Sequence, residues 1–152
     1  MKVSDPLAAF LLLVCCMGLN GFAQTSNGLP AGAEAVGDGI PQALAAPGDA
    51  ARGRALLLAR DPANCILCHG LTDAAVRFAG NLAPPLDGAG SRLTLAQLRL
   101  RVADSSRINP ETIMPAYYKT TGLRAVASAY QGKPVLTAQQ VEDVVVYLST
   151  LK

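Results

Sequence analysis

The last part of the chain has the clearest alternation of apolar and polar positions. Its apolar side chains recur at helical spacing: Val141, Val144, Val145 and Leu148. Thr137 and Gln140 form a capping box, in which each side chain can bond to the other's backbone N–H and so begin a helix. We therefore expect an amphipathic helix to about Leu151 whose apolar stripe packs against another element.

Two earlier segments also predict helices. Asp49 can cap a helix over 50–60, which has small and apolar residues at helical spacing. Gly53 inside it costs about 1 kcal/mol relative to alanine, and such a glycine usually indicates close contact with a neighbouring backbone. A second capping box, Thr94 with Gln97, begins a helix to about Ala103. The pattern predicts an all-α protein in which the first helix is the natural partner of the last.

The chain before the first helix divides into two parts. Residues 1–23 have a basic start, an apolar run over 7–17 and a cleavage pattern at 21–23, and predict a cleaved signal peptide. The apolar run is too short to span a membrane. Cys15 follows Val14, a poor match to a lipoprotein signal. We therefore expect an exported protein without a membrane span.

Residues 24–47 form an Ala/Gly/Pro-rich extension with little periodicity. The composition favours a flexible tether, and its scattered apolar residues leave an arm laid on a partner as the alternative. Residues 48–152 then form one domain. With a net charge of +2, no basic run and no Trp, the chain does not indicate a nucleic-acid partner.

The sequence Cys65-Ile66-Leu67-Cys68-His69 is the C-x-x-C-H attachment signature for c-type haem. Two thiols three residues apart can bond covalently to the two vinyl groups of the porphyrin. The adjacent imidazole, of His69, then lies under the iron as an axial ligand. We expect one covalently bound haem c.

Three other interpretations of the cysteine pair remain open. A structural zinc site usually needs four protein ligands, and no other Cys or His follows residue 23. A thioredoxin-like dithiol is expected beside a βαβ pattern, which the sequence does not have. A plain disulfide leaves His69 unexplained.

Met114 is the candidate for the second axial ligand, because Met1 and Met17 lie in the predicted signal peptide. It precedes Pro115, which disfavours a helix there. The alternatives are a core-filling methionine, Lys119 or Lys133 as the ligand, or an open position.

Side chains and carbonyls around the haem have several possible roles. The Pro-rich segment at Pro84 can lie against the haem and offer a carbonyl to the imidazole N–H. Three arginines are expected at the solvated surface, with one of them pairing with a haem propionate as an alternative: Arg92, Arg99 and Arg101. Tyr117 and Tyr118 can pack in the core or form a wall of the haem pocket.

Together these residues resemble class I cytochromes c. The resemblance implies an all-α fold with crossing N- and C-terminal helices and the haem in a loop-lined pocket. Gly53 and Leu57, with Val144 and Tyr147, match the family's crossing pairs. It also implies that Pro84 and Leu86 line the pocket, with the Pro84 carbonyl accepting from His69, and that Met114 is the distal ligand. The family's usual glycine before that proline is Ala83 here.

Three segments resemble the SoxX family more closely: PPLDGAGSR (84–92), RINPETIMPAYY (107–118) and AYQGKP (129–134). SoxX is the monohaem subunit of SoxAX, a heterodimeric cytochrome of bacterial sulfur oxidation. The resemblance implies an electron-transfer subunit of a periplasmic enzyme, an L-cysteine S-thiosulfotransferase. That enzyme joins thiosulfate to a cysteine of a SoxYZ-like carrier protein, and a soluble acceptor then takes the electrons.

The resemblance places the catalytic cysteine on a SoxA-like partner and no catalytic residue on this chain, so whether the chain alone is an enzyme stays open. A free-standing periplasmic carrier is the alternative, and a haem enzyme with an open iron site is a third. Met114 argues against the third, because a sixth ligand blocks substrate. Only three lysines follow residue 23, which favours a lasting interface over transient docking.

Overall fold

A computed structural model of the chain describes residues 28–152, so the predicted signal peptide lies outside the described residues. Within this range there are four α-helices: α1 (Ala50–Leu58), α2 (Ala89–Arg92), α3 (Leu95–Asp104) and α4 (Ala138–Thr150). Three short 3-10 turns join them: η1 (Cys65–Leu67), η2 (Ser105–Arg107) and η3 (Ser128–Tyr130). The same residues contain two isolated β-bridges and no longer strand.

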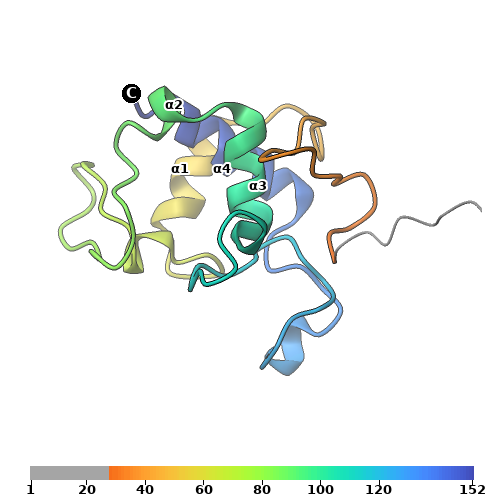
Figure 1. The fold of residues 1–152 in the computed structure, drawn as a ribbon. Helices are drawn as coiled ribbons and strands as arrows, with labels where there is room; N and C mark the ends of the chain where they lie inside the picture. Colours follow the sequence, from red (N-terminus) through yellow and green to blue (C-terminus); the bar gives the residue numbers. More distant parts are fainter. Residues whose placement is uncertain (1–27) are drawn as a thin grey trace, which may run out of the picture.

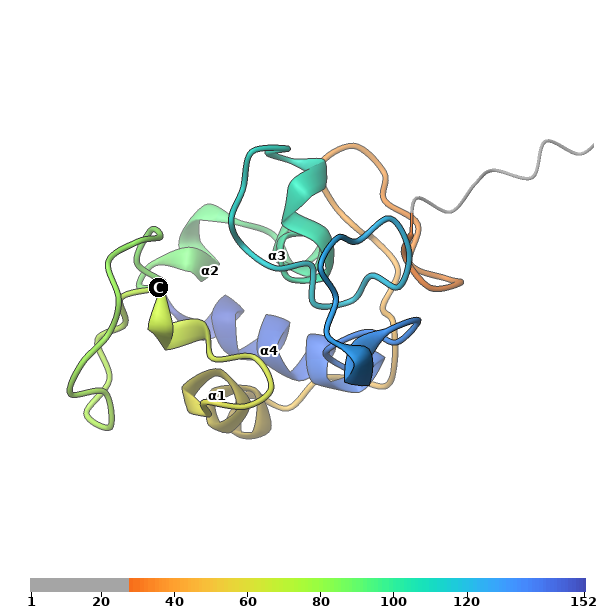
Figure 2. The same ribbon diagram turned by 90° about the horizontal axis from the view of Figure 1, so that it is seen from below.

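Helix α4 lies between α1 and α3 in both ribbon views (Figures 1 and 2). Its contact with α1 is the most extensive between any two helices of the described chain. A Cβ atom at Gly53 would come within 1.9 Å of the Asp143 carbonyl oxygen, so only glycine allows the two backbones to approach this closely. The predicted crossing of the first and last helices is therefore confirmed.

The helix beginnings follow the short capping signals. The Asp49 side chain accepts a hydrogen bond from the Arg52 N–H, at 2.7 Å, and begins α1. Thr94 and Thr137 make complete capping boxes with Gln97 and Gln140. Helix α1 ends at Leu58, two residues before the predicted end, ahead of Pro62.

The described part of the extension, residues 28–47, packs against the chain's own core. Ile40 is fully buried, and Leu29 and Ala33 are nearly so. The Ile40 N–H donates to the Ala96 carbonyl at 2.9 Å. These residues therefore do not form the flexible tether that the composition favoured, since their few apolar side chains and backbone groups find partners on α3 and the loops beside it.

Arg99 corrects a second expectation, because it is buried rather than solvated. Its guanidinium donates to Glu142 Oε1 at 2.6 Å and to Oε2 at 3.0 Å, and a third N–H donates to the Ile40 carbonyl at 2.6 Å. Glu142 Oε1 also accepts from the Leu44 N–H at 3.0 Å. This network joins α3, α4 and the extension. The Glu142 carboxylate neutralises the charge of the Arg99 guanidinium inside the core.

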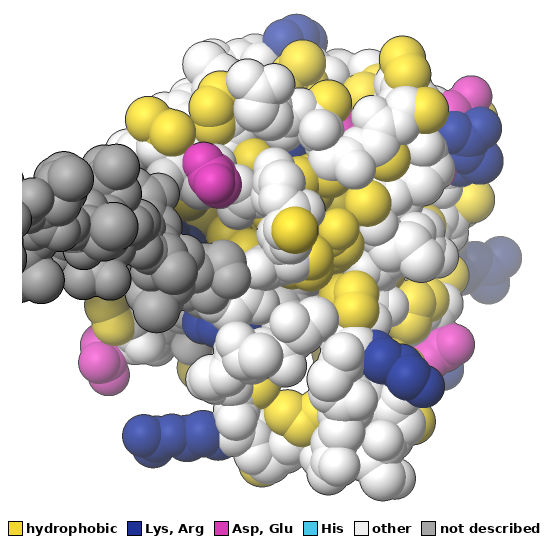
Figure 3. All heavy atoms as spheres, turned by 90° about the vertical axis from the view of Figure 1, so that its right-hand side faces the viewer, with side chains coloured by type: hydrophobic (Ala, Val, Ile, Leu, Met, Phe, Trp, Pro, Cys, Tyr) yellow, Lys and Arg dark blue, Asp and Glu magenta, His cyan; other side chains and the backbone are white. Residues whose placement is uncertain are grey.

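Most other arginines and lysines of the described chain are exposed, whereas Arg54, Arg101 and Lys119 are partly buried. Figure 3 shows Lys and Arg side chains scattered singly around one face of the molecule, with acidic side chains among them. Between residues 28 and 152, no helix combines the length and the apolar character needed to cross a bilayer.

Candidate haem site

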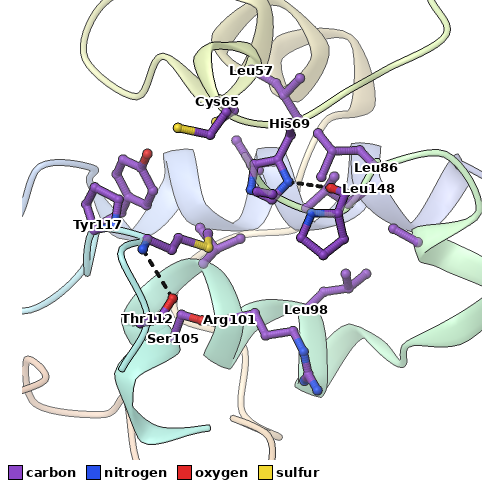
Figure 4. A pocket seen from close by; sticks show the side chains of 18 of the residues that line it. Leu57, Cys65, His69, Leu86, Leu98, Arg101, Ser105, Thr112, Tyr117 and Leu148 are labelled. Carbon is purple, nitrogen blue, oxygen red and sulfur yellow. Dashed lines mark hydrogen bonds between the residues drawn. The ribbon is translucent and has the colours of Figure 1, made fainter. Parts of the chain in front are cut away.

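A single cavity of about 640 Å³ brings together the six residues singled out from the sequence. They all line it: Cys65, Cys68, His69, Pro84, Leu86 and Met114. Helices α1, α3 and α4 add apolar walls that include Leu57, Leu98 and Leu148 (Figure 4). Residues that are up to 49 positions apart in the sequence, Cys65 and Met114, therefore face the same space.

The two cysteines are presented on one tight turn. Turn η1 begins at Cys65, and the Cys65 carbonyl accepts from the N–H groups of Cys68 at 3.2 Å and His69 at 3.1 Å. Both thiols are free and half-buried, so the pair is not a disulfide in this structure. Burial raises the pKa of the Cys65 thiol to about 11, which keeps it protonated at neutral pH.

His69 is oriented by a single hydrogen bond. Its Nδ1 lies 2.7 Å from the Pro84 carbonyl oxygen, an atom that can only accept, so Nδ1 carries the proton. The lone pair of Nε2 is then available to bind a metal. This is the geometry that a proximal imidazole of a haem needs.

Backbone pairing holds the Pro84 segment against the C-x-x-C-H turn. Three N–H groups of the later segment donate to carbonyls of the earlier one: Gly80 to Ile66 at 2.8 Å, Ala83 to Cys68 at 3.0 Å, and Leu86 to Gly70 at 2.8 Å. A Cβ at Gly80 would lie 1.9 Å from the Leu67 carbonyl oxygen, so this approach requires glycine. The sequence pattern did not reveal this role of Gly80.

The loop between these paired segments is fastened to α1. Arg54 donates twice to Asp73, at 2.7 Å and 2.6 Å. The hydrogen bond from the Arg54 guanidinium lowers the pKa of the Asp73 carboxyl to about 2. The loop is thus fixed to α1, while the turn that carries the thiols is held by the Pro84 segment.

Met114 enters the cavity from the long loop that follows α3. Its N–H donates to the Thr112 hydroxyl at 3.1 Å, a bond that helps to set the shape of the loop. In Figure 4 the His69 ring enters the cavity from one side, and Thr112 lies across from it. The two alternative ligands, Lys119 and Lys133, are not among the residues that line the cavity.

The two tyrosines differ in whether they line the cavity, and so do the three arginines. Tyr117 lines the cavity, and its hydroxyl donates to the Ala63 carbonyl at 2.8 Å. Burial raises the pKa of Tyr117, which keeps the hydroxyl as a donor. Tyr118 is buried outside the cavity lining. Arg92 and Arg101 both line the cavity, whereas Arg99 does not.

The residues present fit a c-type haem. Two free thiols, one imidazole with a committed Nδ1–H and one thioether face an otherwise largely apolar space. These are the groups that covalent attachment and His/Met axial ligation require. Zinc is a poor fit, since the described residues contain no cluster of three or more His, Cys, Asp or Glu that could hold a metal ion.

Comparison with known proteins agrees with this arrangement. The family model of cytochrome c matches residues 50–152. Among solved structures, the chain is similar to a chain of the crystal structure of SoxXA from P. pantotrophus. The two are 40% identical with a TM-score of 0.73, and the match covers 79% of this chain and 94% of that one. The class I cytochrome c fold, one covalently bound haem c with its iron, and the resemblance to SoxX cytochromes are therefore confirmed.

One curated protein also matches, D-inositol 3-phosphate glycosyltransferase from Nocardiopsis dassonvillei. The identity is 36% over 122 residues, which is 74% of this chain. The chain spans only 28% of the length of that protein, so we carry none of its activity over.

The family match over 50–152 covers most of the chain and the whole cavity-bearing domain. The chain belongs to the cytochrome c family.

Proposed function

We propose that this chain is the electron-transfer subunit of a periplasmic, thiosulfate-oxidising complex of the SoxAX type. The observation that carries the proposal is the cavity in which a free Nε2 of His69 and the thioether of Met114 face the same space beside two free thiols. The 40% identity to a chain of SoxXA supports the assignment to this complex. When bound, the haem supplies one-electron redox chemistry.

In this proposal each residue of the site has a separate role. Cys65 and Cys68 would hold the haem covalently, and His69 and Met114 would bind its iron. Pro84 orients His69 through its carbonyl, at 2.7 Å from Nδ1. Leu86 and the apolar walls exclude water from the iron, which influences the potential at which an electron is taken up.

The chain itself is proposed to pass electrons and not to bind thiosulfate covalently. After residue 23 its only cysteines are Cys65 and Cys68, and its only histidine is His69. All three are used by the haem in this proposal, so neither a nucleophilic thiolate nor a general base of these types remains. The catalytic cysteine is therefore expected on a SoxA-like partner, and the cysteine that accepts the thiosulfate on a SoxYZ-like carrier.

The native mass of the exported protein tests the assignment to a complex. We would isolate the haem-staining protein from the periplasm at moderate salt and measure its mass by light scattering. We expect a species well above 15.7 kDa, the mass of the single chain with its leader, and a second chain in the same fraction. A lone monomer, unchanged at low salt, would favour a free-standing electron carrier instead.

Replacing Met114 by alanine tests the distal ligand. We expect the variant to keep its covalent haem, since both thiols remain, and to lose the methionine–iron charge-transfer band of the oxidised protein. The matched control is Ile108→Ala, in the same loop at a side chain that is 39% exposed and does not line the cavity, and it should keep the band. An unchanged band in Met114→Ala would show that another group binds the iron.

A further inference from the structure

The two ends of the loop that carries Met114 lie next to each other. We call residues 105–118 the Met114 loop; Asp104 ends α3 directly before it, and Lys119 directly follows it. Lys119 Nζ lies 2.9 Å from Asp104 Oδ2. We call these two residues the loop-base pair. Because they flank the whole loop, their contact joins its two ends.

The loop-base pair is buried. The Asp104 side chain is completely inaccessible to solvent, and that of Lys119 is 17% exposed. Asp104 Oδ1 accepts a hydrogen bond from the Ser106 hydroxyl, whereas Oδ2 accepts no hydrogen bond and is stabilised by the charge of Lys119. Among the described residues, Lys119 is the one cation within ion-pair distance of Asp104. Without Lys119, a buried carboxylate would lose its only counter-ion.

Neutral contacts also hold the loop base, since the Leu136 N–H donates to the Tyr117 carbonyl at 2.9 Å and the Tyr117 and Tyr118 side chains are buried. Two backbone bonds cross it, from the Tyr118 N–H to the Ala103 carbonyl at 3.0 Å and from the Tyr117 N–H to the Val102 carbonyl at 3.4 Å. The loop above them carries exposed residues at its tip, including Ile113. An uncompensated Asp104 can be hydrated only if this base opens, and opening the base would withdraw Met114 from the cavity.

The extension lies against the Lys119 side of the loop-base pair. The Gly28 carbonyl accepts from the Thr120 N–H at 2.8 Å, one residue beyond Lys119. A Cβ at Gly28, where φ is +82°, would come within 2.9 Å of the Lys119 side chain. The extension thus helps to keep water away from Lys119 and strengthens its attraction to Asp104.

We propose that the loop-base pair, Lys119 with Asp104, is a positioning device that holds Met114 in place as the distal ligand. This inference rests on the proposed role of Met114. Lys119 and Asp104 themselves do not line the cavity, so they act only through the loop. The pair sets how readily the distal side opens to an external ligand.

Imidazole affinity of the oxidised protein measures this opening, because imidazole binds to the iron only where Met114 has left. The variant is Lys119→Met, which keeps the length of the side chain and removes its charge. Its matched control is Lys133→Met, at an exposed lysine away from the cavity. Lys119→Arg keeps the charge, and Asp104→Asn removes the other half of the pair should Lys119→Met fail to fold.

We expect Lys119→Met to bind imidazole about tenfold more tightly than the unmodified protein, the factor that corresponds to losing one charged interaction. Lys119→Arg and Lys133→Met should bind as the unmodified protein does. In a Met114→Ala background, where no methionine has to leave, the effect of Lys119→Met should disappear. Haem content and far-ultraviolet circular dichroism should be the same in all variants.

Three results would count against the inference. Equal imidazole affinity in Lys119→Met and Lys133→Met would show that the pair does not hold the loop. A tenfold effect that persists in the Met114→Ala background would show a general loosening of the pocket and not a positioning of Met114. A Met114→Ala variant that binds imidazole no better than the unmodified protein would instead contradict the role of Met114 and so remove the basis of the inference.

Discussion

Replacing Cys65 or Cys68 by alanine is expected to remove nearly all of the stable haem from the protein. Each thiol supplies one covalent bond to the porphyrin in the proposed site, and both face the same cavity. With one thiol left, the haem would be attached through a single covalent bond, and its position relative to the His69 ring would be less constrained. The measurement is haem staining after denaturing electrophoresis, together with the mass of the intact chain.

Leu67→Ala is the matched control for the cysteine variants. Leu67 belongs to the same turn, is 64% exposed and does not line the cavity. Its replacement should leave the covalent haem intact. Full loading in both cysteine variants would rule out covalent attachment through these thiols.

Replacing Arg99 by methionine is expected to lower the free energy of unfolding by about 3–5 kcal/mol. The arginine is only 5% exposed, and its loss leaves the Glu142 carboxylate buried without a counter-ion. The Ile40 carbonyl also loses its side-chain donor at 2.6 Å. Urea unfolding of the haem-loaded protein, followed by circular dichroism, measures the change.

Two further variants identify the cause of this loss. Arg107→Met removes an exposed arginine beyond α3 and should change stability by less than about 1 kcal/mol. The double variant Arg99→Met with Glu142→Leu removes both charges and should recover much of the loss, since apolar pairs of similar size can replace buried ion pairs. A double variant as unstable as Arg99→Met alone would attribute the loss to packing.

Short local signals predicted helices α1, α3 and α4 and the haem site, but not the single turn of α2. Asp49, Thr94 and Thr137 begin helices through bonds that reach only three residues along the chain, so the sequence alone reveals them. The C-x-x-C-H signature is equally local. Met114 was found by elimination, since the other two methionines lie in the predicted signal peptide.

Contacts between distant segments could not be predicted in this way. Arg99 was expected at the surface because its partner Glu142 is 43 residues away. The extension was expected to be a tether because its few apolar residues show no period, yet Ile40 is fully buried. Tyr117 stayed undecided because its acceptor, the Ala63 carbonyl, is 54 residues away. In each case the deciding partner is supplied by the fold and leaves no pattern in the neighbouring sequence.

The crossing of α1 and α4 also bears on the order in which the protein can be assembled. Residues 59–137 lie between these helices and contain both thiols, His69, Pro84 and Met114. Contacts between segments so far apart form only after the intervening chain has closed, which makes them slow steps of folding. Since α1 and α4 both wall the cavity, the pocket is completed only when they meet. Until then the thiols remain open to solvent, so the haem can be attached to an unfolded chain and enclosed as the two helices come together.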